Sequence, residues 1–144
     1  MQLTSYTDYS LRALLYLGGH RDRLVTVTEI SEHYGVSRNH MVKVIHNLGA
    51  NGYVQTVRGK SGGVRLAKEP QDIKISDVVL LTEPHMEIQE CFSREKNTCP
   101  LIDDCNLMGV FYKARQGFMS VLDAYTLADM LKPKPDNKTN PIPS

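Results

Sequence analysis

The pattern of apolar and polar positions begins with a helix. Residues Thr4–Gly18 repeat apolar side chains at intervals of three and four, which is the period of an α-helix. Ser5 followed by Asp8 resembles a capping box, with Asp in place of the commoner Glu. The residues predicted to share the packed face are Leu11, Leu14, Leu15 and Gly18.

The next region, 28–51, has the pattern of two helices joined by a tight turn. Thr26 with Glu29 predicts a second capping box, and Gly35 stands where a left-handed backbone would end the first helix. Ser37 is placed to cap the second helix. This arrangement predicts a helix-turn-helix, whose second helix enters the major groove of DNA. The residues of that second helix predicted to face the core are Met41, Val44, Ile45 and Leu48.

Two strand-like segments follow and predict a β-hairpin wing over 53–67. Tyr53–Val57 and Val64–Ala67 alternate apolar and polar side chains. The connection between them holds three glycines and two basic residues, Arg58 and Lys60. A helix-turn-helix followed at once by such a hairpin is the winged-helix arrangement.

The second half of the chain divides into parts of different character. A short helix at Ser76–Glu83, capped by Ser76, is predicted to complete a DNA-binding domain over 1–83. The segment 84–104 has no clean period, and the tail 132–144 is rich in proline and polar residues, which predicts disorder. Between them, 105–131 regains a helical pattern, with a break or new cap at Thr126. Its apolar stripe comprises Leu107, Val110, Phe111, Ala114, Phe118, Val121, Leu122 and Tyr125.

The predicted fold is therefore mostly α-helical, with a small β-hairpin wing and a long C-terminal helix. A length of 144 residues and 41% hydrophobic residues fit about one globular domain and exclude a disordered chain or a collagen-like repeat. No apolar run approaches the roughly 20 residues that span a bilayer, and the start lacks the features of a secretory signal. The expected location is the cytoplasm.

Charge is distributed unevenly along the chain. Residues 1–68 carry nine Lys and Arg against four acids, whereas 69–144 carry eight against twelve. A basic first half indicates that this end meets a polyanion such as DNA. The alternative is an ordinary solvated helix face and a polar turn. The candidate DNA contacts are Ser37, Arg38, Asn39, His40 and Lys43 on the second helix of the helix-turn-helix, and Arg58 and Lys60 on the wing.

Three cysteines, Cys91, Cys99 and Cys105, lie within fifteen residues. An odd number argues against a disulfide framework, and the spacing lacks the close pairs typical of zinc and thioredoxin-like sites. Three thiolates on a loop that leads into a helix can hold an iron–sulfur cluster whose fourth ligand is not cysteine. The alternative is that they are inert small hydrophobic side chains.

Four segments closely resemble one known family. Met1–Leu14, Tyr34–Lys43, Val57–Leu66 and Tyr125–Asp129 resemble the NsrR family of nitric-oxide-sensitive repressors, which is related to the iron–sulfur regulator IscR. The resemblance covers about residues 1–131. It implies a winged-helix homodimer that pairs through the long helices and binds a palindromic double-stranded DNA operator. It further implies repression of nitrosative-stress genes, which nitrosylation of an iron–sulfur cluster relieves.

The same resemblance implies a set of ligands. The three cysteines would hold one cluster in each subunit. IscR-like proteins take a His three residues after the last Cys as fourth ligand, but Met108 stands there in this chain. The NsrR pattern suggests Asp8 of the partner subunit instead, against its alternative role in helix capping, and His85 is the fallback. A single carboxylate ligand favours a 4Fe–4S cluster, with 2Fe–2S as the alternative.

Two other functions are consistent with parts of the pattern. A winged-helix regulator with a zinc or thiol-redox site would keep the DNA binding but lack the brown colour of an iron–sulfur protein. A thiol enzyme is disfavoured, because only His85 lies near a cysteine in sequence and no glycine motif of the oxyanion type accompanies it. The chain is therefore predicted not to be an enzyme.

Overall fold

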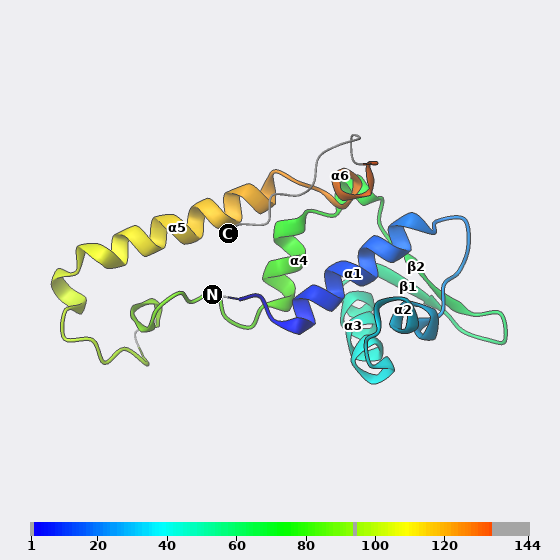
Figure 1. Ribbon diagram of the computed structural model, residues 1–144, viewed down its shortest axis with the longest axis horizontal. Coiled ribbons are helices and arrows are strands. Elements are labelled where there is room, and N and C mark those ends of the chain that lie inside the picture. The colour runs from blue at the N-terminus through cyan, green and yellow to red at the C-terminus, as the bar shows by residue number, and fades with distance from the viewer. Residues whose placement is uncertain (1, 94, 134–144) are drawn as a thin grey trace.

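Helices make up most of the backbone that the structure describes, and one small hairpin interrupts them there (Figure 1). The computed structural model describes residues 2–93 and 95–133, so most of the tail predicted to be disordered lies outside the described residues. The first elements are α1 (Ser5–Gly19), α2 (Val27–Tyr34), α3 (Arg38–Ala50), β1 (Val54–Val57), β2 (Gly63–Leu66), a 3₁₀ turn η1 (Pro70–Asp72) and α4 (Ile75–Thr82). The later elements are the turns η2 (Glu90–Phe92) and η3 (Ile102–Asp104), α5 (Asn106–Asp123) and α6 (Leu127–Leu131).

The start of α1 differs from the prediction. Its cap is Thr4, whose hydroxyl accepts the Thr7 N–H at 3.3 Å, and not Ser5. The Thr4 N–H in turn donates to Glu83 at 2.8 Å, so the helix start is tied to the end of α4. Asp8 takes no part in this cap and pairs with Arg12 one turn later. The predicted capping box of Ser5 and Asp8 is therefore wrong.

The packed face of α1 is also rotated from the predicted one. Its buried residues are Thr7, Ser10, Ala13, Leu14 and Leu17, while Leu11 and Leu15 are only half-buried. Small hydroxyl residues occupy this face because each finds a partner. Ser10 donates to the Tyr6 carbonyl at 2.8 Å, and Thr82 of α4 donates to Thr7 at 2.9 Å. A pattern that counts Ser and Thr as polar misses such positions.

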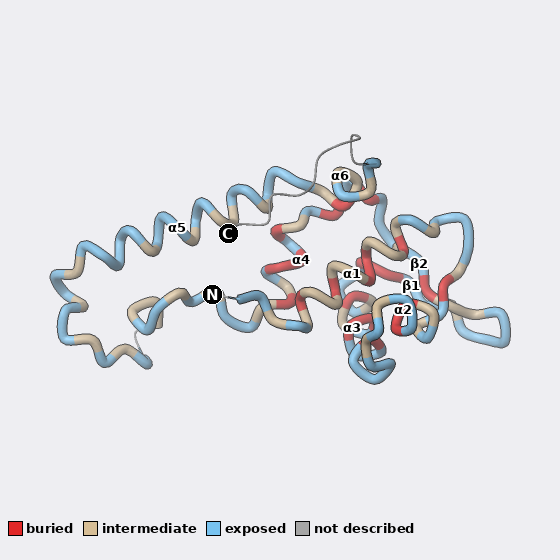
Figure 2. Tube along the Cα trace, in the orientation of Figure 1, coloured by how far each residue is buried: buried red, intermediate tan, exposed pale blue. Residues whose placement is uncertain are grey.

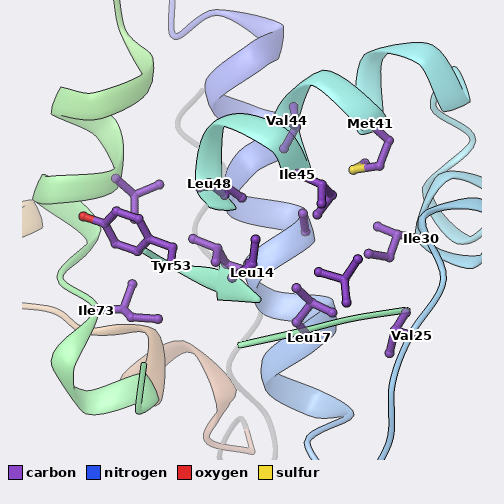
Figure 3. Packing of buried hydrophobic residues seen from close by; sticks show 14 of the residues in the cluster. Leu14, Leu17, Val25, Ile30, Met41, Val44, Ile45, Leu48, Tyr53 and Ile73 are labelled. Carbon is purple, nitrogen blue, oxygen red and sulfur yellow. The ribbon is translucent and has the colours of Figure 1, made fainter. Parts of the chain in front are cut away.

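The helix-turn-helix forms as predicted. Thr26 caps α2 by accepting the Glu29 N–H at 3.1 Å, and Gly35 ends it with φ +64°. Ser37 stands at the start of α3, but its hydroxyl makes no capping hydrogen bond. The four predicted apolar residues of α3 are all buried in the cluster shown in Figure 3, where they face α1 and α2.

The wing is an antiparallel pair in which Val54 lies opposite Leu66 and Val57 opposite Gly63. Val25, just before α2, extends this pairing through two backbone hydrogen bonds with Val64, of 3.0 and 2.7 Å. The side chains of Val25 and Val64 are both buried. The wing is thus joined to the helix-turn-helix by backbone as well as by core packing.

The end of the long helix is anchored to the start of α4. Ser76 is not a cap, because α4 already begins at Ile75. Its buried hydroxyl instead donates to Asp123 at the end of α5, at 3.0 Å, and Lys74 pairs with the same carboxylate oxygen at 3.0 Å. These bonds hold the pKa of Asp123 below its usual range, chiefly through Lys74.

A break separates the long helix from the last one. Thr126 starts α6 with a capping box, in which Asp129 accepts the Thr126 N–H at 2.9 Å. Leu127 is fully buried, and its N–H donates to the Ile73 carbonyl at 2.8 Å. By contrast, α5 projects away from the body and contains no buried residue (Figures 1 and 2). No helix among the described residues is long and apolar enough to cross a membrane.

Candidate nucleic-acid interface and cysteine cavity

The predicted contact residues lie on the outer side of the helix-turn-helix. The core holds α3 by one stripe, and the other side chains of its first two turns face outward. All five predicted residues of this region are exposed, namely Ser37, Arg38, Asn39, His40 and Lys43. The structure therefore places them where they can meet a ligand.

One of these side chains is held by the neighbouring helix. Arg38 Nε donates to the hydroxyl of Thr28, at the start of α2, at 3.1 Å. Within the described residues its two terminal nitrogens have no hydrogen bond. Thr28 carries no signal in the sequence, because no spacing rule connects two residues ten positions apart on different helices.

Two tyrosines of α1 contact residues of α3 that belong to the predicted DNA-binding surface. The Tyr6 hydroxyl donates to the Lys43 carbonyl at 3.3 Å. The rings of Tyr9 and His40 are stacked, with centroids 6.4 Å apart and planes at 22°. Through these two contacts, α1 touches the part of α3 that carries His40 and Lys43.

The basic residues of the wing sit on an ordered turn. Arg58 and Lys60 are exposed between the two strands, and Gly59 between them has φ +114°. The Gly62 N–H donates to the Gly59 carbonyl at 3.0 Å and closes the turn. A side chain at Gly62 would collide with the Val57 carbonyl. The backbone of this turn therefore requires glycine, and it holds both basic side chains away from the body.

A charged network fixes α2 against α1. The Glu29 carboxylate accepts a hydrogen bond from the Tyr16 hydroxyl at 2.8 Å and from Arg23 Nη1 at 3.0 Å. Hydrogen bonding from Arg23, followed by that from Tyr16, lowers the pKa of Glu29 to about 2. The same carboxylate raises the pKa of Tyr16.

The three cysteines line one cavity of about 280 Å³. Each is half-buried, and none forms a disulfide. Met108 and Phe111 of α5 complete the apolar side of this cavity. Across 2–93 and 95–133, no three His, Cys, Asp or Glu side chains already stand at metal-binding spacing. Three cysteines that line one cavity are a donor set of the kind that holds an iron–sulfur cluster.

The other two predicted ligands do not line this cavity. Asp8 lies on α1, where its two carboxylate oxygens pair with Nε and Nη2 of Arg12 at 3.0 and 2.9 Å. His85 lines a different cavity of about 330 Å³, together with Leu3 and Phe118. The cysteine cavity is at the start of α5, at the opposite end of the molecule from the wing (Figure 1).

Comparison with known proteins identifies relatives over nearly the whole chain. The family model Rrf2, described as "Iron-dependent Transcriptional regulator", matches residues 3–133. The HTH-type transcriptional regulator NsrR of Shouchella clausii is 48% identical over 132 residues, 91% of this chain and 89% of that protein. The HTH-type transcriptional regulator NsrR of Bacillus subtilis is 47% identical over 137 residues, which are 94% of this chain and 94% of that protein.

Solved structures agree with this assignment. The IscR of T. potens superposes with a TM-score of 0.73 at 29% identity, covering 91% of this chain and 86% of that one. The winged-helix fold predicted from the sequence is therefore confirmed. The proteins that the chain resembles are named transcriptional regulators, which confirms the prediction that it is not an enzyme.

Proposed function

Since the chain belongs to the Rrf2 family of transcriptional regulators, we propose that it represses genes of nitrosative stress under the control of an iron–sulfur cluster sensitive to nitric oxide. The observation that carries the proposal is the single cavity onto which all three cysteines open. Three thiols around one space are a donor set that can hold such a cluster.

The DNA-binding part of the proposal assigns roles to the exposed basic surface. Arg38 and Asn39 on α3 have the donors and acceptors that pair with guanine and adenine in the major groove. Ser37, His40 and Lys43 would contact nearby bases or phosphates. Arg58 and Lys60 would neutralise phosphates beside the groove, which releases counterions and makes binding depend on salt. The region proposed for these contacts is 1–83.

The cluster-binding part rests on the cysteines of the segment 84–104 and on Cys105. Cys105 occupies the position just before the first turn of α5, where unpaired N–H groups favour negative charge. Cys91 and Cys99 approach the cavity from the preceding loop. A bound 4Fe–4S cluster, or 2Fe–2S as the alternative, would supply iron that reacts with nitric oxide. The residues of this chain provide its thiolates and an apolar wall.

A second copy of the chain completes the proposed site. The stripe on α5 leaves Val110 and Val121 about 60% exposed, so two long helices can cover each other. Asp8 of the partner subunit is the fourth ligand that the resemblance implies, and this chain's own Asp8 does not line its cysteine cavity. A carboxylate exchanges from iron more easily than a thiolate. Its release would let the two DNA-binding domains move relative to each other and change the spacing of the two reading helices over a palindromic operator.

Substitution of one thiol tests the control of DNA binding by the cluster. We expect Cys99→Ser to give a folded, colourless dimer without specific DNA binding, because two thiolates do not retain the cluster. Wild-type protein and the control Ser93→Ala, purified without oxygen, should both be brown with broad visible absorption. Cys99→Ser that protects its operator like wild type would contradict cluster control. A colourless wild-type protein containing zinc would instead support a zinc-dependent regulator.

A further inference from the structure

We propose that Thr28 is a positioning residue that sets the direction in which Arg38 reads DNA. The inference rests on the proposed DNA binding, because it assigns a role within that surface. Thr28 belongs to α2 and Arg38 to α3, and one side-chain hydrogen bond of 3.1 Å joins them. Thr28 itself need not touch the DNA for this role.

The bond engages only one of the three guanidinium nitrogens of Arg38. Because Nε donates to Thr28, the rotation of the planar group about its last bonds is restricted. The nitrogens Nη1 and Nη2 are then presented together as a fork, the geometry that matches the O6 and N7 acceptors of guanine. An arginine already held in its bound orientation loses less rotamer freedom when it binds.

Thr28 is itself fixed by the structure around it. Its carbonyl accepts a hydrogen bond from the buried Ser31 hydroxyl at 2.8 Å, and Ile30, two positions later, is fully buried. The turn at Gly35 then sets α2 against α3, with the Val36 N–H donating to the Ser31 carbonyl at 2.9 Å. The backbone that carries Thr28 is therefore anchored to the core, although its side chain lies on the surface.

Four variants separate this role from others. DNA for the measurement is obtained by selecting random duplexes on the anaerobically purified wild-type protein, and an unrelated duplex serves as the non-specific probe. Thr28→Val removes the hydroxyl while keeping the shape of the side chain. We expect it to bind the selected duplex roughly tenfold more weakly, the lower end of what one bidentate base contact contributes. Non-specific binding and the salt slope should not change.

Rescue and coupling complete the test. Thr28→Ser should bind like wild type, since it retains the hydroxyl that accepts the hydrogen bond from Arg38 Nε. In the Arg38→Ala background, Thr28→Val should cause no further loss, because no guanidinium is left to position. Circular dichroism and thermal melting confirm that every variant is folded.

The opposing outcomes are distinct. If Thr28→Val weakens both probes equally and flattens the salt slope, Thr28 binds phosphate directly and the inference is wrong. The inference also fails if Thr28→Val binds like wild type, or weakens binding further without Arg38. If Arg38→Ala itself binds the selected duplex normally, the role proposed for Arg38 falls together with that of Thr28. If no duplex is enriched by the wild-type protein, the proposed DNA binding fails.

Discussion

At the scale of single residues, the carboxylate of Glu29 joins three segments of the body. Tyr16 reaches it from α1, Arg23 from the following loop, and its own backbone belongs to the capped first turn of α2. These bonds favour the ionised form and lower its pKa to about 2. The position of the helix-turn-helix against α1 therefore depends in part on one ionised group.

Glu29 makes stability depend on pH in a defined direction. An unfolded Glu has a pKa of about 4.3. The pKa of Glu29 is lower in the folded protein. The ionised Glu29 therefore stabilises the fold fully above about pH 4.3, and this stabilisation is lost as the pH falls to about 2. Glu29→Gln should lower the free energy of unfolding at pH 7, and the difference from wild type should shrink below about pH 4.3. Urea unfolding across this range measures it.

The control is Glu32→Gln, an exposed position on the same helix. Asp123 and Asp129 also have lowered pKa values and contribute in the same acidic range, so the difference between variant and wild type is the quantity to compare. A constant difference between Glu29→Gln and wild type at every pH would show that the charge of Glu29 is not what stabilises the contact.

Arg58 on the wing supports a second prediction at this scale. If its side chain neutralises a phosphate, Arg58→Ala should weaken binding to all sequences about equally and reduce the salt slope by about one. Lys113→Ala is the control, because it removes the same charge from an exposed position on α5, far from the wing. Binding measured at several salt concentrations tests the pair. An unchanged slope for Arg58→Ala would show that Arg58 touches no phosphate.

At the scale of elements, the wing depends on close backbone contacts in its turn. Gly62 lies where a Cβ would be 2.9 Å from the Gly59 carbonyl and closer still to that of Val57. The hydrogen bond between Gly62 and Gly59 closes the turn. Arg58 and Lys60 are therefore presented by a backbone in which a side chain at Gly62 would collide with backbone atoms.

Gly62→Ala should open this turn. The steric conflict is with backbone atoms, so we expect a loss of about 1–3 kcal/mol in the free energy of unfolding, as for overpacked sites. Amide chemical shifts should change mainly over 54–66, and DNA binding should weaken. Ser61→Ala, at an exposed neighbour in the same turn, should preserve both. Wild-type stability and shifts for Gly62→Ala would mean that the turn adapts without cost.

At the scale of the whole molecule, a firmly anchored helix carries an uncovered apolar face. The far end of α5 is fixed by Asp123, and the buried Leu127 follows it. Along its length, by contrast, α5 exposes Leu107, Val110 and Val121 by more than half. A surface of this kind on an anchored arm is typical of an interface between copies.

Charge on this stripe should prevent the proposed dimer. Val110→Glu would place a carboxylate between the paired helices, so we expect a monomer at micromolar concentration and weaker operator binding. Gln116→Glu places the same side chain on the opposite face of α5 and should remain dimeric. Sedimentation velocity compares the two. A dimeric Val110→Glu protein would exclude this stripe as the interface.

What the sequence determined by itself was local. The stripe of Met41, Val44, Ile45 and Leu48 and the left-handed Gly35 depend on preferences within a few residues, so periodicity and turn chemistry found the helix-turn-helix. The clustering of the three cysteines singled them out, and the resemblance added Asp8, in both cases without geometry. Their roles as ligands, the DNA contacts and the domain limits remain predictions.

Tertiary structure alone decided the features that join distant segments. Ser76 looked like a cap in sequence, but its hydroxyl donates to Asp123, 47 residues away. Thr4 caps α1, and its N–H donates to Glu83 at the distant end of α4. Thr28 accepts a hydrogen bond from Arg38 on another helix. A short polar side chain can satisfy its hydrogen bonds locally or across the fold, and only the packing of the helices determines which partner it takes.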